Sequence, residues 1–66
     1  MTTFGEQVKA RRRELHLGQV ELAELAGVSP SMVRALEHGK TTVQLDKVRA
    51  VLDVLGLELT VMMKSQ

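Results

Sequence analysis

Residues 19–39 read QVELAELAGVSPSMVRALEHG, and this stretch decides the fold. Apolar residues recur at helical spacing over 19–26, and Gly27 directly after them is the residue type that most often ends a helix in the left-handed conformation. A second helix is predicted to begin after Ser29, because Ser is a favourable N-cap and Pro30 then takes the first helical position, where its missing N–H costs nothing. The stretch therefore predicts two short helices joined by a tight turn.

Small and branched residues in this stretch predict how the two helices pack. Ala23 is small enough to let another helix approach closely, and Val28 is expected to fill the inside of the turn. Val33 and Leu36 lie three residues apart and are expected to face inward. A generic helical hairpin does not need all of these features at once. The spacing therefore favours a helix-turn-helix, whose second helix protrudes far enough to enter the major groove of DNA.

Further helices are predicted on both sides of this motif. One is expected over 4–16, with Thr3 as its cap and Glu6 three residues later, as in a capping box. Its inner face is expected to carry Phe4, Val8, Arg12 and Leu15. The other is expected over 44–55. Its buried stripe is expected to be Leu45, Val48, Val51, Leu52 and Leu55. The predicted fold class is mainly α, with a helical core over 4–56.

The hydrophobic period changes after Gly56. Apolar residues now stand at every second position, which predicts a half-buried β-strand over 57–63. A single strand leaves its N–H and C=O groups without a ladder partner. We therefore expect a second copy to pair with it antiparallel across a two-fold axis, which gives a homodimer. The expected interface residues are Leu57, Leu59, Thr60, Val61 and Met63. A fifth helix or a frayed tail stays open as the alternative.

The size of the chain points to the same need for a partner. Its 66 residues are expected to form one domain, 1–66, and a chain this short buries only roughly 60% of the surface of its unfolded form. Such domains usually need a disulfide, a metal or a second chain. The sequence has no Cys, and His16 and His38 have no further ligands at a metal-binding spacing. We expect no metal and no cofactor, so dimerisation is the remaining source of stability.

Charge and hydropathy exclude several classes of function. The net charge is only +1, although residues 1–16 hold four Lys or Arg against two Glu. No stretch approaches the ~20 apolar residues of a membrane span, and the first residues do not resemble a signal peptide. We therefore expect a cytoplasmic protein without a membrane partner. The sequence shows no nucleophile beside a base and no phosphate-binding Gly loop, so we expect no enzymatic activity and no catalytic residue.

Residues 4–57 resemble the Cro/repressor, or Xre-type, family of helix-turn-helix proteins, which includes phage repressors. The matching residues are Arg12, Gln19, Leu22, Ala23, Ala26, Gly27, Val28, Ser29, Ser31, Val33, Leu36, Glu37 and Gly39. The resemblance implies a four-helix, lambda-repressor-like domain that binds double-stranded DNA at a palindromic operator. The last helix and the segment VLDVLGLELTV (51–61) resemble the HipB-type antitoxins, in which a C-terminal strand pairs across the dimer.

The resemblance also assigns DNA-binding positions. They are Gln19, Ser29, Pro30, Ser31, Arg34, Ala35, Lys40 and Thr41. Arg34 is the best candidate for reading a base, because a guanidinium can donate to both O6 and N7 of guanine. A phosphate contact or a solvated side chain stays open for Arg34. Pro30 stands where the family commonly has a polar residue, which removes one side-chain contact to a base. Lys40 and Thr41 are expected to meet phosphate.

Arg12 and Glu37 are predicted to serve the architecture first. Arg12 lies on the inner side of its helix by spacing, and Glu37 follows the inward-facing Leu36. The resemblance implies that they form a partly buried salt bridge.

These expectations lead to two hypotheses of function. The first is a sequence-specific transcriptional repressor that occupies its operator as a homodimer and blocks polymerase. The second adds a HipA-like kinase toxin as a partner, so that the protein is the antitoxin of a HipBA-like module that autoregulates its operon. Two alternatives stay open, namely a stand-alone regulator without a toxin and a helical module used only for protein contact.

Overall fold

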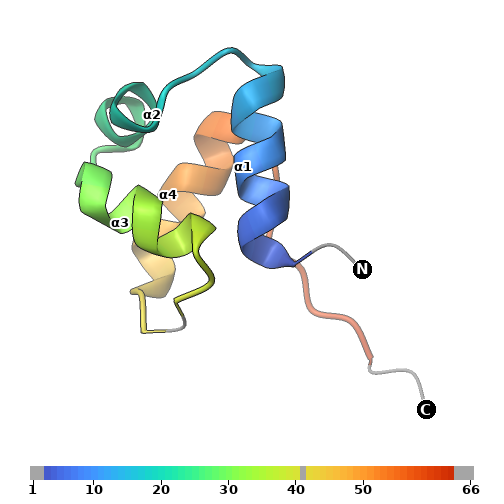
Figure 1. Ribbon diagram of the computed structural model, residues 1–66. Coiled ribbons are helices and arrows are strands. Elements are labelled where there is room, and N and C mark those ends of the chain that lie inside the picture. Colours follow the sequence, from blue (N-terminus) through green and yellow to red (C-terminus); the bar gives the residue numbers. More distant parts are fainter. Residues whose placement is uncertain (1–2, 41, 64–66) are drawn as a thin grey trace.

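Four helices surround one apolar core in the computed structural model, which describes residues 3–40 and 42–63 (Figure 1). The helices are α1 (Phe4–Glu14), α2 (Gln19–Ala26), α3 (Pro30–Glu37) and α4 (Leu45–Leu55). The mainly α, four-helix architecture expected from the sequence is confirmed. The predicted bounds differ from these by at most two residues, at the end of α1.

Side-chain caps start two of the helices as the sequence predicts. The hydroxyl oxygen of Thr3 accepts a hydrogen bond of 3.2 Å from the Glu6 N–H, and the hydroxyl donates to the Glu6 carboxylate at 3.0 Å. The Ser29 hydroxyl accepts from the Met32 N–H at 3.1 Å, with Pro30 as the first residue of α3. These bonds satisfy N–H groups that have no carbonyl partner inside the helix.

A residue in the left-handed region ends α1, where His16 has φ = 57°. This turn lets the Leu17 N–H reach back to the Arg12 carbonyl at 3.1 Å, so that α1 stops before the predicted residue 16. At the end of α2, Gly27 takes the same left-handed conformation with φ = 72°, and the Val28 N–H donates to the Ala23 carbonyl at 3.0 Å. Gly adopts this conformation without a Cβ clash, whereas His16 does so at a cost.

The buried apolar residues come from all four helices. They are Val8, Leu22, Ala23, Val33, Leu36, Val48, Val51, Leu52 and Leu55. Three residues that we expected on the inner faces are exposed instead of buried, with exposed fractions of 44% for Phe4, 38% for Leu15 and 65% for Leu45.

Gly5 explains why the inner face of α1 differs from the predicted one. The buried residues of α1 are Gly5, Val8 and Arg12. A Cβ on Gly5 would lie 2.7 Å from the Leu36 carbonyl oxygen and even closer to that of Glu37. Only Gly lets α1 approach the backbone of α3 this closely, and this approach turns Phe4 toward the surface.

The tail that follows α4 runs past α1 as a chain without helical turns (Figure 1). Arg11 Nε donates to the Leu55 carbonyl at 2.8 Å, which ties the end of α4 to α1. Residues 57–63 are not helical, so the fifth-helix alternative is wrong. Within residues 3–40 and 42–63 no strand is formed, and the pairing of this segment with a second copy stays a prediction. No helix among these residues has the length and apolarity needed to cross a membrane.

Candidate DNA interface

Helices α2 and α3 meet at the turn 27–29, and α3 lies at the outside of the molecule (Figure 1). Val33 and Leu36 hold one face of α3 against the core, with exposed fractions of 0% and 2%. Ser31 and Arg34 stand on the other face and are exposed. The sequence folds this way because the N-cap and the two buried positions fix both the start and the rotation of α3. The exposed face of this helix is therefore free to approach a ligand.

Hydrogen bonds prearrange part of the exposed face of α3. Arg34 Nη2 lies 3.3 Å from the Ser31 hydroxyl oxygen and donates to it, so the guanidinium lies over the first turn of the helix. Ser29 is exposed, but its hydroxyl is already used as the helix cap. Pro30 and Ala35 are half-buried and offer no polar side-chain atom. Among these five predicted residues, Arg34 and Ser31 have exposed polar side chains that are not used to cap the helix, and their contact with DNA stays a prediction.

Lys40 lies just beyond the end of α3. Its N–H donates to the Ala35 carbonyl at 3.0 Å, across the turn at Gly39, and its side chain is exposed. Its position beside the exposed helix suits a phosphate contact. The other predicted residue of this segment, Thr41, lies outside the described residues.

Arg12 and Glu37 form the ion pair that joins α1 to α3. Arg12 Nε donates to Glu37 Oε2 at 2.7 Å and Nη2 donates to Oε1 at 3.0 Å, a two-pronged geometry. The side chains are only 10% and 3% exposed. Arg12 Nη1 also donates to the Leu17 carbonyl at 2.9 Å, so one guanidinium fixes the loop between α1 and α2 as well.

Gln19 extends this network to the start of α2. Its Nε2 donates to Glu37 Oε1 at 3.2 Å, and the residue is half-buried. We expected Gln19 from the sequence as a DNA contact, which stays a prediction, and the structure shows its amide donating one hydrogen bond to Glu37. The side chain is thereby held at the junction of α2 and α3. Sequence reasoning missed this contact because nothing local relates positions 19 and 37.

The network shifts the pKa of both ionised groups. Burial of the Glu37 carboxylate alone would raise its pKa, but hydrogen bonds from Arg12 and Gln19, with the charges of Arg12 and Lys9, lower it below its ordinary value. The hydrogen bond to Glu37 raises the pKa of Arg12, against the opposing effect of burial. Both groups are therefore charged at neutral pH, and the ion pair is fully formed there.

The start of α2 already carries an acidic side chain. Glu21 lies in the first turn, and its Oε1 accepts a hydrogen bond of 3.0 Å from the Gly18 N–H. A carboxylate at this end stabilises the helix through its dipole. It also places a negative charge at this end of the helix, which disfavours a second anion there.

Within the described part of the chain, no three His, Cys, Asp or Glu residues are grouped as metal ligands. Arg11 Nε donates to the Leu55 carbonyl at the end of α4, a contact that sequence reasoning missed because the two residues are 44 positions apart.

The fold and the exposed face of α3 together define the class of DNA-binding helix-turn-helix regulators. The sequence model of the family described as Helix-turn-helix matches residues 8–62. The chain therefore belongs to the Helix-turn-helix family, and the resemblance to Xre-type proteins is confirmed.

Two relatives of the chain carry regulatory names. The chain is 41% identical over 59 residues to the uncharacterized HTH-type transcriptional regulator y4mF of Sinorhizobium fredii (strain NBRC 101917 / NGR234), covering 89% of this chain and 78% of that protein. It is 36% identical over 58 residues to the immunity repressor protein of Bacillus phage phi105. That match covers 88% of this chain and 40% of the phage protein, so the chain spans less than half of the repressor's length.

Solved structures of SinR have a similar fold. SinR in complex with DNA, described as the master regulator for biofilm formation, superposes with a TM-score of 0.74 at 30% identity, covering 85% of this chain and 90% of that one. The complex of SinR with SinI gives a TM-score of 0.74 at 30% identity, with 83% of this chain covered. This chain spans 54% of the SinR–SinI chain.

Proposed function

We propose that the chain is a transcriptional repressor that binds a palindromic operator as a homodimer, with α3 in the major groove. One observation carries the proposal. The network of Arg12, Glu37 and Gln19 fixes α1, α2 and α3 to one another, while Ser31 and Arg34 stay exposed on α3. A rigid scaffold that presents a guanidinium on a protruding helix is suited to reading guanine.

The proposed mechanism is steric. Two copies of α3, related by a two-fold axis and about 34 Å apart, would read half-sites one turn of DNA apart. Occupation of the operator then blocks polymerase. The reading surface of α3 is sparse, because Pro30 and Ala35 supply no polar side-chain atoms. Sequence preference should therefore rest on Arg34, on Gln19 and on DNA shape. Lys40 supplies a positive charge for contacts with the phosphate backbone of the DNA.

A fluorescence anisotropy titration against DNA from upstream of the gene tests this proposal. Arg34→Ala should weaken binding by about 1–3 kcal/mol per half-site, or roughly five- to 150-fold, and should reduce the preference over scrambled DNA. Arg34→Lys keeps the charge and loses the two-pronged geometry, so it should lose the preference while retaining much of the affinity. Arg49→Ala, on α4, is the charge-matched control and should change neither property by more than about threefold.

The dependence of DNA affinity on salt concentration is the second measurement in this test. Binding should weaken steeply with salt, because each phosphate contact releases counterions. Wild-type affinity for the upstream DNA equal to that for scrambled DNA would overturn the proposal. Absence of any salt-dependent DNA affinity would favour the alternative of a module used only for protein contact.

A finer proposal is that the chain is the antitoxin of a HipBA-like pair and also holds a kinase toxin. The resemblance of the last helix and residues 51–61 to HipB-type antitoxins motivates this proposal. That the similar protein SinR is found in a complex with SinI adds support for protein partnering. Co-purification with the product of the adjacent gene tests the proposal. A gene without a toxin neighbour would favour a stand-alone regulator.

A further inference from the structure

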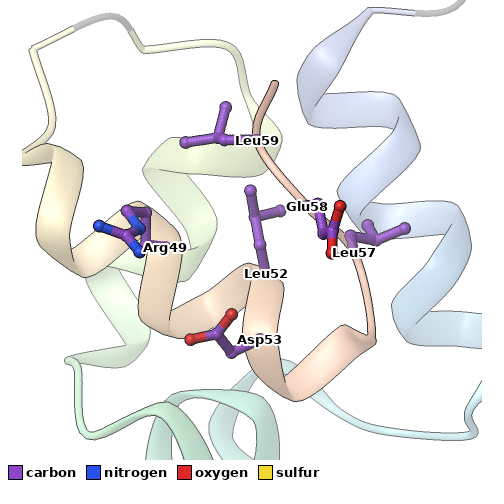
Figure 2. Close-up of a pocket in the computed structure, with 6 residues that line it drawn as sticks. All are labelled: Arg49, Leu52, Asp53, Leu57, Glu58 and Leu59. Carbon is purple, nitrogen blue, oxygen red and sulfur yellow. The ribbon is translucent and has the colours of Figure 1, made fainter. Parts of the chain in front are cut away.

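Residues 57–59, the first half of the tail 57–63, line two open grooves. The groove toward α4 has a volume of about 250 Å³ and is lined by Arg49, Leu52, Asp53, Leu57, Glu58 and Leu59 (Figure 2). The groove toward α1 has a volume of about 220 Å³ and shares Leu52 and residues 57–59 with the first. The rest of its lining is Phe4, Gln7, Val8 and Thr60. The first is rimmed by charged side chains and the second mainly by apolar ones.

Exposure along the tail changes abruptly at its middle. Leu57 is half-buried and Leu59 is 45% exposed, because this half of the tail packs on α1 and α4. Val61 and Met63 share the same face of an extended chain but are each 98% exposed. The tail has here run past the N-terminal end of α1 (Figure 1). The second half of the tail therefore carries apolar side chains that no helix of the same copy covers.

We propose that a second copy of this chain covers this half, with the two tails antiparallel and Thr60 on the two-fold axis. This inference rests on the proposed homodimer and specifies its register. With the axis at Thr60, residues 61–63 of one copy run beside residues 59–57 of the other. Val61 and Met63 of one copy then lie over the helices of the other copy. They lie there beside the Leu59 and Leu57 of that other copy.

The alternation of side chains supports this register. Residues directly opposite each other in an antiparallel pair point to the same face. The four odd-numbered apolar residues of one tail can therefore lie opposite those of the other tail only if the two-fold axis passes through a residue, not between two residues. Among such registers, the one centred on Thr60 alone pairs Leu57 with Met63 and Leu59 with Val61. A centre at 59 or 61 leaves one of the four without an apolar partner within the tail. A centre at 58 places Glu58 opposite its own copy, where like charges repel.

The choice of groove follows from charge and from Phe4. A strand laid into the groove toward α4 would cover Arg49 and Asp53, and burying charged groups is costly. The groove toward α1 instead offers the ring of Phe4, which is 44% exposed. The partner's tail therefore enters on the α1 side, where its Val61 and Met63 cover Phe4. This assigns an interface role to a residue outside the tail.

Single-cysteine variants of the full chain, oxidised and run on a non-reducing gel, test the register. Thr60→Cys should cross-link to its own copy nearly completely, because residues opposite each other on the axis have Cα atoms about 4.5–5.5 Å apart. Glu58→Cys is the matched control on the same outer face. Its two copies would lie roughly 14 Å apart, too far for a disulfide, so it should stay uncross-linked. Cross-linking of Glu58→Cys but not of Thr60→Cys would overturn the register.

Sedimentation of two further variants tests which face is buried. Val61→Asp should weaken dimerisation roughly tenfold or more, because each dimer would bury two unpaired charges. Met62→Asp, on the outer face, should change it by less than about threefold. The reverse order would overturn the inference while leaving a dimeric repressor intact. A wild-type chain that sediments as a monomer and binds the operator as a monomer would overturn both this inference and the proposed homodimer.

Discussion

Removal of the Glu37 carboxylate should destabilise the fold strongly, because it leaves the buried Arg12 guanidinium without its ion-pair partner. In Glu37→Ala, the Arg12 guanidinium keeps only the Leu17 carbonyl as its partner, while its side chain is 10% exposed. Gln19 loses its acceptor as well. Breaking a buried pair by removing one partner costs about 3–5 kcal/mol, since it leaves the other charge desolvated and unpaired.

That cost is large for this chain. A domain of 66 residues has a total stability of roughly 3–10 kcal/mol, taking 0.05–0.15 kcal/mol per residue. One kcal/mol moves the melting temperature of so small a domain by about 4–8 °C, so Glu37→Ala should lower it by roughly 12–40 °C. Circular dichroism at 222 nm during heating measures this directly.

Two variants make the result interpretable. Glu37→Gln retains an acceptor oxygen and should fall between the wild type and Glu37→Ala. Glu24→Ala removes an exposed carboxylate from α2 and should shift the melting temperature by only a few degrees. A Glu37→Ala variant that melts within a few degrees of the wild type would refute the reasoning, because the pair would then contribute no more than a surface ion pair.

Three more outcomes are expected. His16→Gly should stabilise the domain by about 1 kcal/mol, because Gly adopts the left-handed φ of 57° without a Cβ clash; thermal melting would show no gain if this turn carries no strain. Gly5→Ala should lower the free energy of unfolding by about 1–3 kcal/mol in urea titrations, because the added methyl group would meet the Leu36 carbonyl. Gly18→Ala is the control and should lower it less, because the nearest neighbour of its added carbon is 3.4 Å away. Folding lowers the pKa of Glu37, so the contribution of its carboxylate to stability is complete above its unfolded pKa of about 4.3 and is lost as the pH falls through the lower folded value. In acid titrations, the free energy of unfolding should therefore fall less steeply with decreasing pH in Glu37→Gln than in the wild type. Equal slopes in the two proteins would contradict this prediction.

Local signals made the helices and their ends predictable from the sequence. Thr3 and Ser29 cap helices because a hydroxyl at that position satisfies a free N–H, and this needs no knowledge of the rest of the fold. Gly27 ends α2 for an equally local reason. The family resemblance supplied the ion pair between Arg12 and Glu37, which periodicity alone would not have matched across 25 positions.

Contacts between helices were less predictable. In a short helix, two neighbouring stripes can both look apolar, and the choice between them depends on how closely the next helix approaches. Gly5 makes that choice in α1 and leaves Phe4 half exposed. The bond from Arg11 to Leu55 spans 44 positions and has no local signature. The period of two after Gly56 predicted a strand over 57–63. The structure assigns these residues to neither a helix nor a strand, and a strand needs a ladder partner that one chain does not contain.

Hydroxyl-radical footprinting on the upstream DNA tests the central claim most directly. If two copies of α3 read half-sites across a two-fold axis, the wild-type protein should protect two patches centred about 10–10.5 base pairs apart, and Arg34→Ala should lose both together. Protection of a single patch, or protection spread evenly over the fragment and unchanged in Arg34→Ala, would contradict the claim that α3 reads an operator as part of a dimer.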